Sequence, residues 1–165
     1  MQSSVVLGLG SNLGDREAAI QGALARLEAL GYRATRTSSL YLTEPVGGPP
    51  QGWFVNAVCD GETALAPEAL LHACHAVEQE LGRVRGEPNG PRTIDIDVLF
   101  FGEAIRHAPD PVLPHPRLAE RRFVLEPLVE IRPELVHPVL GKSARELLAL
   151  CPDASAVRRL AGARA

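Results

Sequence analysis

The order of its strand-like and helix-like segments predicts an α+β fold of the ferredoxin-like type for this 165-residue chain. Two segments have the apolar periodicity of helices, and four others are short runs bounded by Gly- and Pro-containing turns. They follow one another in the order β-α-β-β-α-β, which builds a mainly antiparallel sheet with both helices packed on one face. A Pro-rich C-terminal extension follows this βαββαβ sandwich.

The strands are predicted where apolar or Thr-rich runs lie between turns. They are expected at residues 4–9, 32–42, 54–62 and 93–101. The second and third strands are separated by residues 44–52, whose Pro and Gly content precludes regular structure. We therefore expect a loop between them.

Capping residues predict where the two helices begin and end. The first is expected to begin after Asp15, a candidate N-cap, and to stop at Gly31. The second is expected to begin at Pro67, because proline suits the first helical position, and to stop at Gly82.

The chain beyond the fourth strand is harder to assign from its pattern. Residues 102–140 are Pro-rich and are expected to be mostly irregular, with short helical turns. Ser143 and Glu146 form a capping-box pattern, which predicts a last helix through Leu150. We expect a single domain over residues 1–151 and a loosely ordered tail over residues 152–165, which lack strong periodicity.

Composition excludes some classes of function. A net charge of −3 and an aromatic content of 4% argue against a nucleic-acid-binding surface. The apolar runs are too short to span a bilayer, and the N-terminus lacks the pattern of a secretion signal. The three cysteines are scattered without a C-x-x-C spacing, which suits a reducing compartment. We expect a cytoplasmic monomer that binds neither nucleic acid nor membranes.

Two aspartates on the predicted fourth strand are the strongest local indication of chemistry. Side chains alternate faces along a strand, so Asp95 and Asp97 point the same way, with Cα atoms ~6.5 Å apart. Carboxylates at this spacing can converge on one hard cation or bridge two. The alternative is an amphipathic strand whose polar face is solvated, and two aspartates alone do not decide between these interpretations.

Arginines near the aspartates favour the functional interpretation. Arg83, Arg85 and Arg92 lie just before them in a Gly/Pro/Arg-rich loop, and Arg121 comes later in the chain. Guanidinium groups suit phosphate oxygens, and carboxylates beside them would hold Mg²⁺ on the same phosphates. Solvated loop cations remain the alternative for Arg83 and Arg85. His115, between two prolines, has a rigidly placed ring, although a lone histidine is more often structural than functional.

Six sequence blocks in the same order resemble the 6-hydroxymethyl-7,8-dihydropterin pyrophosphokinase family. The resemblance covers about residues 5–140. Its blocks are LGSNLGD at 9–15, SLYLTEPVG at 39–47, FVNA at 54–57, GRVR at 82–85, GPRTIDID at 90–97, and PHPR at 114–117 through RRFVLEPL at 121–128. The resemblance implies transfer of a pyrophosphoryl group from ATP to the pterin alcohol, giving AMP and the pterin pyrophosphate in folate biosynthesis. It also implies a ferredoxin-like fold, which the element order predicts independently.

The resemblance assigns roles to individual residues. For the phosphates it implies two Mg²⁺ ions held by Asp95 and Asp97. Around the ATP phosphates it places Arg83, Arg85, Arg92, His115 and Arg121, with the first three also assisting catalysis. For the pterin it places Thr43, Glu44, Pro45 and Val46 along the ring, Phe54 and Phe123 on its two faces, and Asn56 at its hydrogen-bonding edge.

Two other functions share the predicted fold. A non-catalytic ligand-binding module would not need two aspartates facing an arginine-rich loop. An RNA-binding module would need aromatic residues exposed on the sheet and a basic surface, which this composition does not favour. The release of AMP from ATP in the presence of the pterin alcohol would distinguish the enzyme from both.

Overall fold

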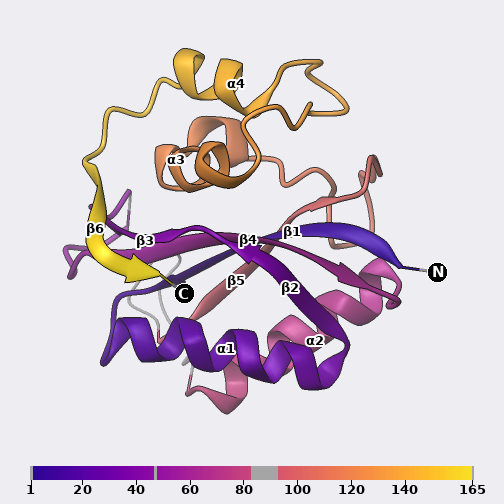
Figure 1. Cartoon of the computed structure of the whole chain (residues 1–165), viewed down its shortest axis with the longest axis horizontal. Coiled ribbons are helices and arrows are strands. Elements are labelled where there is room, and N and C mark those ends of the chain that lie inside the picture. The colour runs from indigo at the N-terminus through magenta and orange to yellow at the C-terminus, as the bar shows by residue number, and fades with distance from the viewer. Residues whose placement is uncertain (1, 47, 83–92, 165) are drawn as a thin grey trace.

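The computed structural model describes residues 2–46, 48–82 and 93–164, with side chains described as far as residue 160. A six-stranded antiparallel sheet has the strand order β5-β1-β4-β3-β6, and β2 also pairs with β4 (Figure 1). The elements are β1 (Ser3–Ser11), α1 (Arg16–Leu30), β2 (Tyr32–Thr37), β3 (Ser39–Thr43), β4 (Phe54–Thr63), α2 (Pro67–Glu80), β5 (Asp95–Phe101), the 3₁₀ turn η1 (Leu118–Glu120), α3 (Arg122–Ile131), α4 (Ala144–Leu150) and β6 (Val157–Arg164). When β2 and β3 are counted as one divided strand, the first seven elements confirm the predicted βαββαβ order.

The strand predicted over residues 32–42 is divided into two. Ser38 lies at the break, where its backbone N–H donates to the Val58 carbonyl at 2.8 Å and its hydroxyl accepts from the Val58 N–H at 3.0 Å. β2 and β3 therefore pair with successive halves of β4. The Ser38 hydroxyl takes the place of a backbone carbonyl as the acceptor for the Val58 N–H. Side chains of this type compete with backbone pairing, which the periodicity of the sequence does not reveal.

The predicted helix ends are confirmed where a capping residue defines them. The Asp15 carboxylate accepts from the Ala18 N–H at 3.1 Å, and Gly31 ends α1 with φ 115°. A residue other than glycine would be strained at this positive φ. Ser143 and Glu146 form both hydrogen bonds of a capping box at the start of α4.

Helices cover both faces of the sheet, α1 and α2 on one side and α3 and α4 on the other (Figure 1). Successive side chains of β1 point to opposite faces of the sheet and therefore pack against different helices. Leu7 and Leu9 enter the core beneath α1 and α2, whereas Val6 packs with Leu125 and Leu128 of α3. The face covered by α3 is the one that carries the candidate site.

The expectation of mostly irregular chain over residues 102–140 is wrong for α3. Pro127 inside this segment suggests a helix break, because proline removes one backbone hydrogen bond. Val124, Leu125, Leu128 and Ile131 nevertheless form an apolar face that is buried against the sheet. Burial of this face outweighs the missing hydrogen bond, since most helical stability in proteins comes from such packing.

The expectation of a loosely ordered tail also differs from the structure. Residues 157–164 form β6, which pairs antiparallel with β3 in the register Tyr41↔Arg159 and Thr43↔Val157. Without β6, β3 would present unpaired backbone groups along the edge of the sheet. Pairing of this kind uses backbone groups, so it requires no side-chain periodicity in the tail.

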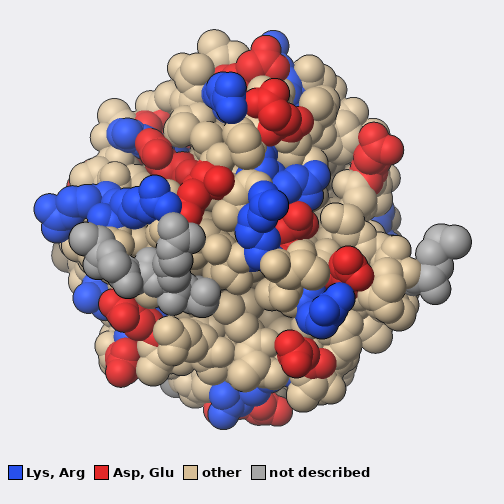
Figure 2. Space-filling model, viewed as in Figure 1, with Lys and Arg blue, Asp and Glu red and all other residues tan. Residues whose placement is uncertain are grey.

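The surface is mixed in charge. On the face shown in Figure 2, acidic and basic side chains lie next to one another in most places. The ion pairs of the described residues include Arg132 with Asp60 at 2.9 Å and Arg145 with Glu134 at 3.1 Å. Among the described residues, no helix combines the length and apolarity needed to cross a bilayer.

Candidate functional site

A cavity of about 310 Å³ lies on the α3 face of the sheet, between the strands and the start of α3. Most of the residues that the sequence predicts for a site line it. They are Thr43, Glu44, Val46, Phe54, Asn56, Asp95, Asp97, His115, Arg121 and Phe123. Pro45 is not among the lining residues, and Arg83, Arg85 and Arg92 lie outside the residues that the structure describes.

The two aspartates of β5 point into the cavity, as their spacing predicts. Ile94, Ile96 and Val98 alternate with Asp95 and Asp97 and are buried in the core on the other face. Both aspartates are only partly buried. Among the described residues, no third histidine, cysteine or acidic side chain completes a metal-binding group with them.

Strand β1 forms the floor of the cavity with two glycines. Gly8 lies opposite Asp97 on one neighbouring strand, and Gly10 lies between Asp95 of β5 and Asn56 of β4. A Cβ atom at Gly10 would lie 2.3 Å from the Oδ1 atom of Asn56. Only glycine therefore allows the Asn56 amide its present position.

These glycines have no role among those predicted from the sequence. Two glycines in alternate positions of a strand weaken it unless another group approaches the backbone closely. Their spacing in β1 could have indicated an open floor on one face of the sheet, but their ligand could not have been deduced from it.

Asn56 is held in place on the side of the cavity away from the aspartates. It is 8% exposed, and its Nδ2 atom donates to the Oγ1 atom of buried Thr43 at 2.7 Å. Phe54 lies two residues before Asn56 on β4, paired with Thr43 of β3, and Phe123 of α3 also lines the cavity. We call these four residues the ring half, because aromatic faces beside an oriented amide suit a flat polar ring.

His115 is fixed by its backbone and by one ring nitrogen. Its N–H donates to the Leu99 carbonyl of β5 at 2.9 Å, and its Nδ1 atom accepts from the Arg117 N–H at 3.2 Å. Burial, followed by the positive charge of Arg121, lowers the pKa of His115 to about 4. The ring is therefore neutral at pH 7, with its proton on Nε2, 4.0 Å from the Oδ1 atom of Asp97. At that pH the contact is not an ion pair.

Two arginines complete the side of the cavity that contains the aspartates. The Arg121 guanidinium lies 5.5 Å from the centre of the Phe123 ring, a cation–π distance that links the two sides. Arg117, for which the sequence analysis proposed no role, also lines the cavity. We call Asp95, Asp97, His115, Arg117 and Arg121 the charged half. Its mixed charges suit a phosphate group together with a cation.

Comparison with known proteins identifies the family. The family model described as 7,8-dihydro-6-hydroxymethylpterin-pyrophosphokinase (HPPK) matches residues 6–133. The 2-amino-4-hydroxy-6-hydroxymethyldihydropteridine pyrophosphokinase of Methylorubrum extorquens is 46% identical over 155 residues, covering 93% of this chain and 96% of that protein. The protein of the same name from Pseudomonas aeruginosa is 43% identical over 164 residues, covering 99% of this chain and 100% of its own length.

Longer proteins contain the same unit. The folic acid synthesis protein Fol1 of Pneumocystis carinii is 44% identical over 140 residues, which are 85% of this chain but 19% of that protein. The chain thus spans about a fifth of its length. A crystal structure of Plasmodium falciparum HPPK-DHPS shares the fold, with a TM-score of 0.70, 18% identity, and coverage of 91% of this chain and 44% of that chain. From the family model and the relatives of matching length, we conclude that the chain belongs to the 7,8-dihydro-6-hydroxymethylpterin-pyrophosphokinase family.

Proposed function

We propose that the chain transfers a pyrophosphoryl group from ATP to 6-hydroxymethyl-7,8-dihydropterin, giving AMP and the pterin pyrophosphate in folate biosynthesis. One observation carries this proposal: a single cavity contains both a charged half and a ring half. The charged half would bind the phosphates, and the ring half would bind the pterin. Membership of the family supports the same assignment.

The charged half fits Mg²⁺ bound together with ATP. Asp95 and Asp97 would hold two Mg²⁺ ions, since carboxylates on one strand face are the hard oxygen ligands that this cation prefers. Mg²⁺ bound here would neutralise charge on the phosphate oxygens. Arg121 and the neutral Nε2–H of His115 would donate to the same oxygens. The sequence prediction for Arg83, Arg85 and Arg92 as phosphate ligands is retained in this proposal.

The protein's part in the reaction is mainly to position the two substrates. The hydroxymethyl oxygen would attack the β-phosphorus of ATP in line, and the bond from that phosphorus to the oxygen bridging it to the α-phosphorus would break, so that AMP leaves with that oxygen. The proton of the hydroxymethyl group would pass to water. Phosphoryl transfer of this kind depends on placement and charge stabilisation more than on covalent chemistry by the protein. Thr43, Asn56 and the two phenylalanines would hold the ring so that its hydroxymethyl group faces the charged half.

The products of the reaction test the proposal directly. Incubation with ATP, Mg²⁺ and the pterin alcohol should give AMP and pterin pyrophosphate in equal amounts, as measured by liquid chromatography. ATP alone should give no AMP at a comparable rate, and chelation of Mg²⁺ should stop the reaction until Mg²⁺ is restored. Release of ADP, or binding of both ligands without turnover, would exclude a pyrophosphokinase.

Gly10→Ala should impair pterin use specifically. The new Cβ atom would collide with Asn56 Oδ1, and relief of such overpacking typically costs about 1–3 kcal/mol, so KM for the pterin should rise about tenfold. Gly8→Ala is the matched comparison on the same strand, because its Cβ atom would meet the Leu99 side chain at 3.4 Å instead of Asn56. Equal effects of the two substitutions on KM for the pterin would contradict this role for Gly10.

A further inference from the structure

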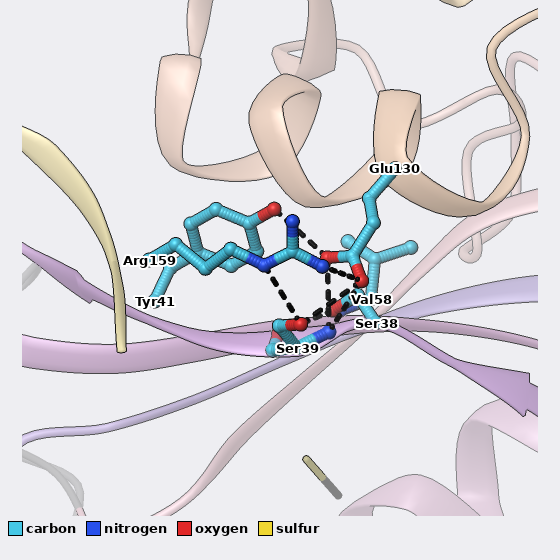
Figure 3. Close-up of polar contacts among 6 residues, drawn as sticks. All are labelled: Ser38, Ser39, Tyr41, Val58, Glu130 and Arg159. Atoms are coloured by element: carbon cyan, nitrogen blue, oxygen red, sulfur yellow. Dashed lines mark hydrogen bonds and ion pairs between the residues drawn. The ribbon is translucent and has the colours of Figure 1, made fainter. Parts of the chain in front are cut away.

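A cluster of four side chains joins the C-terminal tail to α3 and β3 behind the cavity. We call Ser39, Tyr41, Glu130 and Arg159 the brace (Figure 3). The Glu130 carboxylate of α3 accepts from the Tyr41 hydroxyl at 2.8 Å and from the Ser39 backbone N–H at 2.9 Å. Arg159 of β6 donates to Glu130 at 2.6 Å and, through Nε, to the Ser39 hydroxyl at 2.9 Å. The Glu130 carboxylate of α3 is therefore hydrogen-bonded to both β3 and β6, which are distant from it in the sequence.

Glu130 needs these partners because its side chain is only 14% exposed. Burial raises the pKa of Glu130, but hydrogen bonds from Tyr41 and Ser39, with the charge of Arg159, lower it below its ordinary value. The carboxylate is thus ionised at neutral pH. Removal of Arg159 would leave a largely buried negative charge without this cation, so the carboxylate and its donors would have to rearrange.

The tail also contacts Glu44, which lines the cavity, and Arg122, which lies between the lining residues Arg121 and Phe123. The Glu44 backbone N–H donates to the Ala156 carbonyl at 3.0 Å, and the Glu44 carboxylate accepts from the Ala156 N–H at 2.7 Å. Asp153 accepts from the Arg122 N–H at 3.0 Å, at the first residue of α3. The tail segment 153–159 therefore contacts both walls of the cavity, the wall of β3 at Glu44 and the wall of α3 beside Phe123.

We infer that the tail segment 153–159 positions the ring half of the cavity, and that Arg159 is the positioning residue that holds the segment in place. This inference rests on the proposed function, because it assigns the segment to pterin binding. Phe123 lies on the same helix as Glu130, and Thr43 follows Tyr41 by two residues on the same strand. The brace therefore sets the separation of the aromatic and polar walls between which a flat ring would lie. The charged half is built on β5 and the 114–121 segment, and none of its residues belongs to the brace.

Arg159→Ala should raise KM for the pterin about five- to tenfold, as expected for loss of roughly one charge-assisted hydrogen bond, and should change KM for ATP by less than about twofold. Arg158→Ala is the matched control. Arg158 has the same charge and lies next to Arg159 on β6, opposite Leu42, outside the brace. Its substitution should leave both KM values unchanged. Arg159→Lys, which keeps the charge, should restore much of the pterin KM.

A second measurement reports on the cavity wall at Glu44 and does not depend on enzyme turnover. Because the Glu44 amide is bonded to the tail, its hydrogen exchange should accelerate in Arg159→Ala and remain slow in Arg158→Ala. An Arg159→Ala protein that is less stable but has an unchanged pterin KM and unchanged Glu44 exchange would overturn the inference. If Arg159→Ala does not fold, Arg159→Met decides the question by the same two measurements, because it keeps much of the apolar stem of the side chain but removes the charge and the donors to Glu130 and Ser39. Failure of the proposed function itself would appear differently, as absence of AMP release by the unaltered chain and by Arg158→Ala alike.

Discussion

Asp97→Asn is expected to lower kcat/KM by about a thousandfold or more, because loss of a metal ligand removes several kcal/mol of charge stabilisation and each 1.36 kcal/mol is a factor of ten. Asp95→Asn should have an effect of the same order. Both side chains face the cavity from one side of β5, while their neighbours Ile94, Ile96 and Val98 form the core. The substitutions keep the size of each side chain, so the fold should be retained.

Initial rates over a range of Mg²⁺ concentrations, with the melting temperature of each variant, would test this prediction. Glu103→Gln removes one negative charge from an exposed position just after β5 and serves as the control. It should leave both the rate and the Mg²⁺ dependence unchanged. Near-normal turnover of either aspartate variant, with an unaltered Mg²⁺ dependence, would show that these carboxylates are not the metal ligands.

Asn56→Ala is expected to reduce kcat/KM for the pterin about 100-fold or more and to leave the dissociation constant of ATP within about twofold, since a site built to hydrogen-bond a polar ring discriminates strongly by those bonds. The amide is nearly buried and is oriented by Thr43, so water cannot readily replace it at the ring edge. Asn56 is not part of the charged half, so its loss should leave ATP binding nearly unchanged.

Asn56→Asp separates hydrogen bonding from the effect of lost volume. It keeps the size of the side chain, and the Thr43 hydroxyl can donate to it, but it offers no N–H to the ring. We expect a loss of pterin use comparable to that in Asn56→Ala. Steady-state kinetics with each substrate varied, and calorimetric binding of a non-hydrolysable ATP analogue, measure the two effects. Equal weakening of ATP and pterin binding would contradict the placement of Asn56 at the pterin.

Features that depend on a few neighbouring residues could be predicted from the sequence alone. Asp15 and Gly31 define the ends of α1 through hydrogen bonds and a backbone conformation within one turn of the helix. The shared face of Asp95 and Asp97 follows from the two-residue period of any strand. The six sequence blocks assigned fourteen residues to the candidate site, of which ten line one cavity, Pro45 does not, and three lie outside the described residues.

Features that depend on contacts between distant segments were decided only by the tertiary structure. Pro127 is compatible with α3 because the sheet buries the apolar face of that helix, and β6 forms because β3 has a free edge to pair with. Likewise, Gly10 is significant only because β4 brings Asn56 next to it, and Glu130 only because Arg159 and Ser39 converge on its carboxylate. The local pattern around each of these residues contains no sign of its partner, since burial and strand pairing are properties of the whole fold.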